Sequence, residues 1–466
     1  MPPSASNNGG RTGSNPNMSE DIVHTLSESV QNTCRIDPEL FEKYGVKRGL
    51  RNADHSGVLV GLTRIGNVVG YEARDGKPIA AIPGKLIYRG INVEEIVHAA
   101  QKENRFGFEE TAYLLLSGQL PDAAELEKFQ ALINEKMVLN QKTTMNIIDL
   151  EGRNIMNILA RCVLELYTHD AHPDDTGSEN LMRQAVELIA RFPTIIAYAD
   201  NVYRHAYMDK TLAIRKPKAG RSIAENFLYM LKGEYTDLEA KVLDCALIIH
   251  AEHGGGNNSS FTVRVTSSSG TDTYSSIASG IGSLKGPLHG GANLMVIDQF
   301  NHLKQAIKDW TDRNEVGDYL DRILRKEVYD KKGLIYGIGH AVYTISDPRA
   351  VLLKDMAREL AKEKGREKEF AFLELLEEEA IARFMRHKGE RIGKQVCANV
   401  HFYSGFVYEM IGLSREVYTP LFAMSRIAGW MAHRIEELNF KSKRIIRPAY
   451  KSVEAERPFT PLSERH

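Results

Sequence analysis

The sequence predicts a mostly helical fold with short strands near the N-terminus. Beyond Asn92, apolar residues recur every three to four positions in most segments, which is the spacing of helices packed on one face. Between Asp37 and Gly90 the chain is instead glycine-rich and interrupted. Strands and helices do not alternate regularly, which argues against a doubly wound or barrel architecture.

The individual elements follow from these patterns. Strands are expected at residues 58–62 and 80–87, where short β-like runs occur. The apolar spacing predicts helices at residues 93–101, 108–117, 123–139, 144–167, 179–198, 222–232, 237–250, 273–282, 292–304, 318–326, 350–362, 367–387 and 420–438. Charges of both signs crowd residues 354–391, which indicates solvated helix faces on a smaller domain. The Ser-, Asn-, Gly- and Pro-rich start predicts a disordered tail over residues 1–25.

Composition excludes several classes of partner. The 466 residues include 60 Lys and Arg against 61 Asp and Glu, so the formal net charge is −1. This balance gives no overall attraction for nucleic acid or an anionic membrane, and any anionic ligand must be held by locally placed cations. The sequence contains no run of 18 apolar residues, so no membrane span is predicted. The four cysteines form no C-x-x-C pair, which fits a reducing compartment. No clear presequence is found, so we expect a cytoplasmic protein, and an organellar matrix is the alternative location.

Four histidines lie in distinctive motifs. They are His253 in AEHGGGNNSS, His289 in GPLHGGAN, His340 in YGIGHAVYTISDPRA and His401 in CANVHFYSGF. Glycine lets the backbone approach a ligand closely, and histidine can donate, accept or change charge near neutral pH. A single motif of this kind is weak evidence, but four of them in otherwise helical sequence favour one convergent polar pocket.

Other kinds of site fit the sequence less well. His250 and His253 are three positions apart, but the segment does not read H-E-x-x-H and no carboxylate-rich motif follows, so no metal site is expected. The segment GIGHAV stops one glycine short of a dinucleotide fingerprint, and neither a P-loop nor a G-x-S-x-G elbow occurs. Acid–base chemistry on a carbonyl compound remains.

Three arginines could supply the cations for a substrate with several carboxylates. Arg349 lies in DPRA, Arg426 in FAMSRIAGW and Arg447 in RIIRPAY. Planar guanidinium groups bind carboxylates through two parallel hydrogen bonds. Arg426 interrupts an otherwise apolar helix, where an unpaired charge is costly, so we expect it to meet a ligand or a carboxylate.

Together, these motifs resemble the citrate synthase family, from LIYRGINVEEI at Leu86 to RIIRPAY ending at Tyr450. The resemblance implies a mostly helical homodimer in which a small helical domain, residues 290–406, is inserted into a large one, residues 26–289 and 407–466. The implied reaction condenses acetyl-CoA with oxaloacetate and hydrolyses the citryl-CoA thioester. Coenzyme A would then arrive as a thioester substrate, with no covalently bound cofactor.

The resemblance also implies roles for the histidines. His289 resembles the residue that polarises the thioester carbonyl and helps to form the enol of acetyl-CoA. His340 resembles the residue that protonates or polarises the keto group of oxaloacetate. His253 resembles a histidine that contacts oxaloacetate. Such an enol must form away from water, which closure of the cleft would ensure.

The cationic residues are assigned in the same way. Arg349 and Arg426 resemble the clamps that hold the carboxylates of oxaloacetate. Arg447 resembles an arginine that reaches the active site of the partner subunit, which makes dimerisation part of the site. Lys394 resembles a lysine near the phosphates of coenzyme A.

One position departs from the family. The residue before FYSG is the aspartate that takes a proton from the acetyl methyl group in the family, and here it is His401. Imidazole can accept protons at pH 7, but its ring is bulkier and lacks the negative charge that complements nearby cations. His401 could be a substitute base with altered or weaker activity, a substitution that traps an inactive complex, or the mark of a protein that only binds coenzyme A or oxaloacetate. A 2-methylcitrate synthase using propionyl-CoA is the alternative activity.

Overall fold

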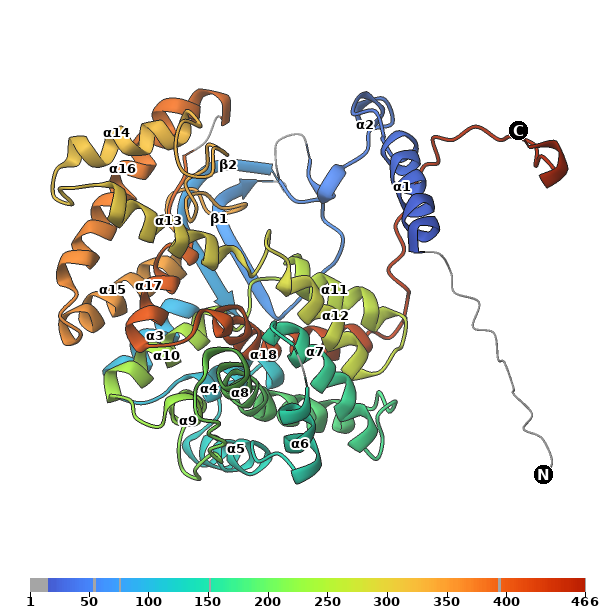
Figure 1. The fold of residues 1–466 in the computed structure, drawn as a ribbon. Coiled ribbons are helices and arrows are strands. Elements are labelled where there is room, and N and C mark those ends of the chain that lie inside the picture. The colour runs from blue at the N-terminus through green and yellow to red at the C-terminus, as the bar shows by residue number, and fades with distance from the viewer. Residues whose placement is uncertain (1–15, 53–55, 75–76, 151, 393–394, 466) are drawn as a thin grey trace, which may run out of the picture. The chain divides into compact units, whose positions relative to one another are not determined.

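A computed structural model describes residues 16–52, 56–74, 77–150, 152–392 and 395–465 (Figure 1). The chain divides into two compact units, residues 1–60 and 61–466. In the first unit, helices α1 (Pro16–Thr33) and α2 (Glu39–Lys43) precede a short 3₁₀ turn, η1 (Arg48–Leu50). The predicted disordered tail overlaps α1 at residues 16–25, and its earlier part lies outside the described residues.

The second unit begins with a three-stranded antiparallel sheet. Its strands are β1 (Gly66–Arg74), β2 (Lys77–Tyr88) and β3 (Ile91–Asn92), in that order. The predicted strand at 80–87 falls within β2 and is confirmed. The prediction for 58–62 is wrong, since these residues lie in irregular chain before β1 and residues 59–62 are exposed, so they lack the half-buried face that stabilises a strand.

Helices make up most of the second unit. The first ten, in chain order, are α3 (Val93–Lys102), α4 (Phe108–Ser117), α5 (Ala123–Lys136), α6 (Gln141–Asp149), α7 (Ile155–Leu166), α8 (Ser178–Met208), α9 (Ile223–Lys232), α10 (Asp237–His250), α11 (Asn258–Ser268) and α12 (Thr273–Lys285). They are followed by α13 (Ala292–Ala306), α14 (Arg313–Leu324), α15 (Pro348–Glu363), α16 (Glu367–Ile392), α17 (His401–Ile411) and α18 (Tyr418–Leu438). Short 3₁₀ turns are η2 (Tyr167–His169), η3 (Arg415–Val417) and η4 (Leu462–Glu464). The mostly helical fold class is confirmed.

The predicted single helix over 144–167 is wrong. It is two helices, α6 and α7, because the side chain of Asn154 accepts a hydrogen bond from Asn157 N and starts a new helix there. Two further helices of the second unit, α11 and α17, are absent from the prediction. The first is rich in Ser and Thr, which disfavour helix interiors. The second is buried on nearly all sides and therefore shows no apolar stripe.

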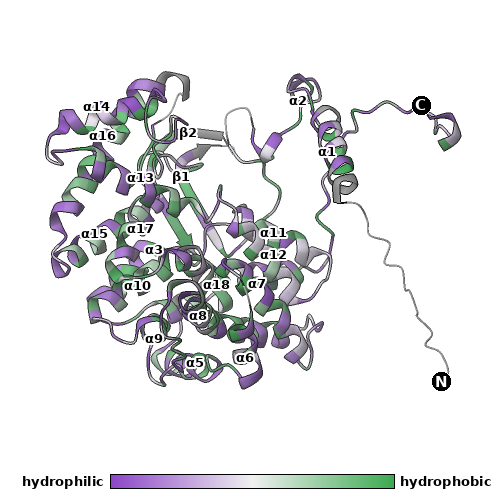
Figure 2. Ribbon diagram, viewed as in Figure 1, coloured by the Kyte–Doolittle hydropathy of each residue, from purple (hydrophilic) through white to green (hydrophobic). Residues whose placement is uncertain are grey.

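The core centres on α18 and α10. All residues of α18 from Tyr418 to Arg434 are buried, and this helix packs against α8, α10, α11 and α12. In Figure 2 the central helices α17 and α18 are largely hydrophobic, whereas hydrophilic residues predominate on α14 and α15. Among the described helices, none combines the length and apolar composition that a membrane crossing requires.

The sheet also positions one loop of the site. Gly84 N donates to Ser346 O over 3.1 Å, which ties β2 to the loop between α14 and α15. A side chain at Gly70 would collide with Val342 O, and one at Gly84 would collide with Ser346 O. Glycine at both positions therefore lets the hairpin lie directly against the loop that carries His340.

Candidate active site

Six of the predicted side chains converge from loops, helix ends and the middle of one helix. His253 follows α10, His289 lies between α12 and α13, and His340 lies between α14 and α15. Arg349 is in the first turn of α15, His401 is the first residue of α17, and Arg426 is in the middle of α18. These residues span about 170 positions of the sequence, and two aromatic rings connect most of them.

The ring of Tyr343 contacts three of the predicted site residues. Its ring stacks on His340 with 4.6 Å between centroids and meets His253 edge-on at 5.8 Å. The two imidazoles are 5.3 Å apart, and the guanidinium of Arg349 lies 5.8 Å from the centre of the tyrosine ring. His340 Nδ1 accepts hydrogen bonds from the backbone N–H groups of Val342 and Tyr343. The neutral ring therefore carries its proton on Nε2, as a donor.

The ring of Phe422 contacts two other predicted site residues and His250. Its ring centroid lies 4.4 Å from that of His250 and 6.0 Å from that of His401. The guanidinium of Arg426, one turn later on α18, is 4.7 Å from the same ring. Phe422 thus forms an apolar wall against which a histidine and an arginine of the predicted site rest.

Backbone pairing ties the His340 and His401 loops together. Gly339 N donates to Cys397 O and Asn399 N donates to Gly337 O, both over 2.8 Å. The side chain of Asn399 then accepts from His401 N, at the start of α17. The relative position of the two histidines is therefore fixed by hydrogen bonds between their own loops.

His289 is held by Ser259. Its Nε2 lies 3.2 Å from Ser259 Oγ, which also accepts a hydrogen bond from Trp430 Nε1. Ser259 Oγ is 3.0 Å from Asn257 Oδ1, so its single proton can serve either acceptor. When it serves His289, the imidazole proton lies on Nδ1, the nitrogen that is available to a ligand.

The two clustered arginines differ in their partners. Arg349 donates from Nε and Nη2 to the two oxygens of Asp347, at 3.0 and 2.7 Å, and both residues are buried. Arg426 is fully buried and donates only from Nε, to His250 O over 2.6 Å. Its Nη1 and Nη2 have no hydrogen-bond partner among the described residues, and neither has His253 Nε2. Buried polar atoms are normally paired, so these three mark a place for a ligand.

Burial and positive charge keep three of the site histidines neutral, namely His253, His289 and His401. Burial, reinforced by Arg349, lowers the pKa of His401 to about 3. Burial and Arg426 lower the pKa of His289 to about 4. Burial, with Arg349 next in importance, also lowers the pKa of His253 well below its usual value. Burial lowers the pKa of Arg426 itself to about 10, which leaves it charged at neutral pH. Arg426 therefore contributes positive charge to the site, whereas His253, His289 and His401 are neutral there.

The remaining two predicted residues lie elsewhere. Arg447 is exposed on the irregular segment after α18, where the neighbouring Ile446 N donates to Ser268 Oγ. It makes no described contact with the other six within its own chain. Lys394 lies outside the described residues.

A second buried network was not foreseen from the sequence. The carboxylate of Glu252 accepts from His433 Nε2 over 2.9 Å, and His433 Nδ1 in turn faces the guanidinium of Arg264. Burial alone would raise the pKa of Glu252, but His433 and Arg426 outweigh it and lower that pKa. Glu252 directly precedes His253, so the network anchors the chain beside the site. The single signal in the sequence was the acidic residue within AEHGGG.

Comparison with known proteins identifies the family. A family model described as citrate synthase, C-terminal domain, matches residues 54–449. Citrate synthase of Acidithiobacillus ferridurans is 36% identical over 392 residues, covering 82% of this chain and 93% of that protein. The chain belongs to the citrate synthase family.

Other similar proteins include a 2-methylcitrate synthase and a citrate synthase of solved structure. 2-Methylcitrate synthase 2 of Corynebacterium glutamicum is 32% identical, covering 82% of this chain and 92% of that protein. A solved structure of citrate synthase from Thermoplasma acidophilum, a ternary complex with carboxymethyl coenzyme A and oxaloacetate, has a TM-score of 0.73 at 29% identity. It covers 90% of this chain and 99% of that one. Membership of the citrate synthase family makes the protein an acyltransferase.

Proposed function

We propose that this protein condenses acetyl-CoA with oxaloacetate to give citrate and coenzyme A, with turnover reduced by His401. The observation that carries the proposal is the guanidinium of Arg426, which is fully buried and whose two terminal nitrogens have no hydrogen-bond partner among the described residues. Buried guanidinium nitrogens without hydrogen-bond partners are costly, and a dicarboxylate would supply the missing hydrogen bonds.

Oxaloacetate would be held at four points of this chain. Arg426 Nη1 and Nη2 would bind one carboxylate. Arg349 uses Nε and Nη2 to pair with Asp347, and its Nη1 would bind the other carboxylate. His253 Nε2 is a further unpartnered buried atom. His340 Nε2–H would donate to the keto oxygen and increase the electrophilic character of its carbon. Arg447 of a second copy would complete the site in a homodimer.

The acyl donor would be activated on the other side of the cluster. His289, with its proton on Nδ1 when Ser259 donates to Nε2, would stabilise the enol oxygen of the thioester. His401 would take the proton from the α-carbon, as a neutral imidazole. The enol carbon would then attack the keto carbon of oxaloacetate. Water would finally hydrolyse the citryl thioester and release coenzyme A.

The identity of the base explains the expected reduction in turnover. A carboxylate becomes neutral when it takes the proton, whereas imidazole becomes a cation beside Arg349. His401 is also the first residue of α17, where the helix dipole disfavours added positive charge. The low pKa of about 3 expresses the same cost, because it measures how poorly this position accepts a proton.

Domain closure completes the proposal. We assign residues 290–406 to a small domain and residues 26–289 and 407–466 to a large one. In support, α14 packs on α16, and both α13 and α15 pack on α17, of which residues 401–406 belong to the small domain. The two catalytic loops of the small domain, with His340 and His401, would close on His289 and exclude water from the enol. Lys394 would lie near the coenzyme A phosphates.

The decisive test replaces His401 and keeps its surroundings. We expect His401→Asp to raise turnover with acetyl-CoA and oxaloacetate at least about tenfold, because a positioned general base contributes about 10²–10⁴-fold. His401→Asn is the matched control, with the same size as aspartate but no basic oxygen, and should not raise turnover. Thiol release and citrate formation are measured together. An aspartate variant no faster than the asparagine variant, with either acetyl-CoA or propionyl-CoA, would contradict the assignment.

The same assay addresses the alternative acyl donor. A 2-methylcitrate synthase relative at 32% identity makes propionyl-CoA the second candidate. The ratio of kcat/KM for the two thioesters in the aspartate variant assigns the activity, since one methylene in an apolar pocket changes this ratio by about 10–200-fold. Tight binding of oxaloacetate without any product would instead identify a protein that only binds its ligands.

A further inference from the structure

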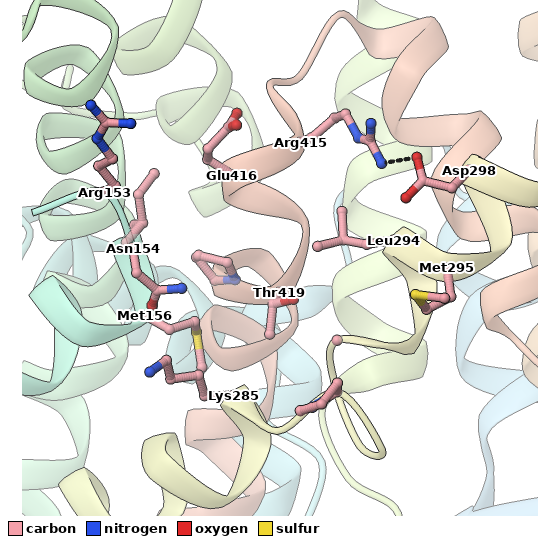
Figure 3. Close-up of a pocket in the computed structure, with 14 residues that line it drawn as sticks. Arg153, Asn154, Met156, Lys285, Leu294, Met295, Asp298, Arg415, Glu416 and Thr419 are labelled. Carbon is pink, nitrogen blue, oxygen red and sulfur yellow. Dashed lines mark hydrogen bonds and ion pairs between the residues drawn. The ribbon is translucent and has the colours of Figure 1, made fainter. Parts of the chain in front are cut away.

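A separate cavity of about 510 Å³ lies beside the loop that carries His289 (Figure 3). Pro287 and Gly291, on either side of His289, line it, but none of the six clustered side chains of the candidate active site does. The cavity lies between the start of α7, the end of α12, the first turns of α13 and the start of α18. Its volume is within the range of small-molecule sites.

Positive charge prevails along its walls. Arg153, Lys285 and Arg415 line the cavity together with two carboxylates, those of Asp298 and Glu416. Arg415 is paired with Asp298, as the dashed line in Figure 3 marks. Within the described part of the chain, neither Arg153 nor Lys285 forms an ion pair, and the guanidinium of Arg153 instead lies over the Tyr207 ring at 4.8 Å. Two cations are therefore available to an anion.

The rest of the lining determines the kind of anion. Met156 faces the cavity from one side, and Leu294 and Met295 face it from the opposite side, in Figure 3. No aromatic side chain lines it among the described residues, so it offers no stacking surface for a nucleobase. An aliphatic body with more than one carboxylate matches the apolar side chains and the two unpaired cations.

We propose that this cavity is a regulatory site for a small aliphatic polycarboxylate, bound by Arg153 and Lys285. The binding part of the proposal stands independently, whereas the regulatory part rests on the proposed function. The loop is cross-linked by its own backbone, since Gly290 N donates to Leu284 O and His289 N donates to Gly286 O. Thr419 Oγ1 also reaches Gly290 O. A ligand that displaces Pro287 or Gly291 would therefore displace His289 with them.

The experiment titrates propane-1,2,3-tricarboxylate into the full chain by calorimetry, with oxaloacetate at saturation to occupy the active site. We expect binding that weakens at least about tenfold in the double variant Arg153→Ala/Lys285→Ala. The matched control Lys128→Ala/Lys142→Ala removes two exposed cations of α5 and α6 and should bind as the parent does. Glycerol, an uncharged polar probe with the same three-carbon backbone, should not bind.

Two results would overturn the binding site. One is the absence of tricarboxylate binding to the parent, and the other is equal weakening in the two double variants. Both comparisons can be read even if the protein does not bind oxaloacetate, so they are separate from the proposed function. Regulation is tested by turnover in the His401→Asp background. A tricarboxylate effect that disappears with Arg153 and Lys285 supports it, and unchanged turnover at saturating ligand rejects it.

Discussion

Arg349 and Arg426 enter the same site from two regions that are built differently. Arg349 follows Asp347 and Pro348 at the start of α15, and Asp347 both caps that helix and pairs with the guanidinium. Arg426 lies in the middle of α18, where its neighbours one turn away are Phe422 and Trp430. One region thus carries a hydrogen-bonded counter-ion, and the other leaves two buried nitrogens without a hydrogen-bond partner among the described residues. The α18 side is therefore the one that a ligand completes in the proposed function.

The first prediction removes one partner of the buried ion pair at the start of α15. Arg349→Met leaves the carboxylate of Asp347 buried with only backbone donors, from Val400 N and from residue 349 itself. Removing one partner of a buried ion pair typically costs about 3–5 kcal/mol, so we expect the free energy of unfolding to fall by about that amount. Urea unfolding followed by circular dichroism measures it.

A double variant checks the cause. Asp347→Asn/Arg349→Met removes both charges and should recover more than half of the lost stability, because no uncompensated carboxylate remains. Equal instability of the single and double variants would mean that the packing of Arg349, rather than its charge, stabilises the region.

The second prediction concerns Arg426, where the expected loss is in ligand binding. Arg426→Met removes a buried cation whose single hydrogen bond goes to His250 O, so the free energy of unfolding should change by less than about 1 kcal/mol. The affinity for oxaloacetate should fall at least about 100-fold, since two charge-assisted hydrogen bonds are lost. Calorimetry and thermal unfolding without ligand separate the two effects. A large loss of stability with intact oxaloacetate binding would reverse the comparison.

The sequence predicts the surroundings of Arg349 better than those of Arg426. The D-P-R triplet places a cap, a proline and an arginine within three residues, so the start of α15 can be inferred locally. The surroundings of Arg426 cannot, because its partner His250 and the buried pair Glu252–His433 join residues more than 170 positions apart. The same reason explains why the aromatic wall of Phe422 was missed, while α4 and α10 were located by their own apolar spacing.

The family motifs select residues that lie together in the structure, although local sequence patterns do not connect them. Six predicted side chains converge, yet nothing in their spacing indicates that Tyr343 lies between His253 and His340 or that Ser259 holds His289. These contacts depend on how the helices pack, and helices with polar or uniformly buried faces, such as α11 and α17, leave no periodic trace in the sequence.

The third prediction is the smallest and uses pH to compare the histidines of the site with those on the surface. His401 has a folded-state pKa of about 3, below the usual value near 6.5 for an unfolded chain. The unfolded state therefore takes up a proton first as the pH falls, so His401 destabilises the fold progressively below about pH 6.5. The groups that set this pKa, after burial, are Arg349, Asp347, His289 and His340.

His401→Asn removes that proton uptake. The plot of unfolding free energy against pH between 6 and 5 should then become shallower by up to about 1.4 kcal/mol per pH unit. His98→Asn, which removes an exposed ring on α3, is the control and should leave the slope unchanged. Urea unfolding at half-unit intervals gives both slopes. Identical slopes for the parent and His401→Asn would mean that His401 is protonated as easily in the folded protein as in the unfolded chain, and a cationic ring at that position could not accept the proton of the thioester.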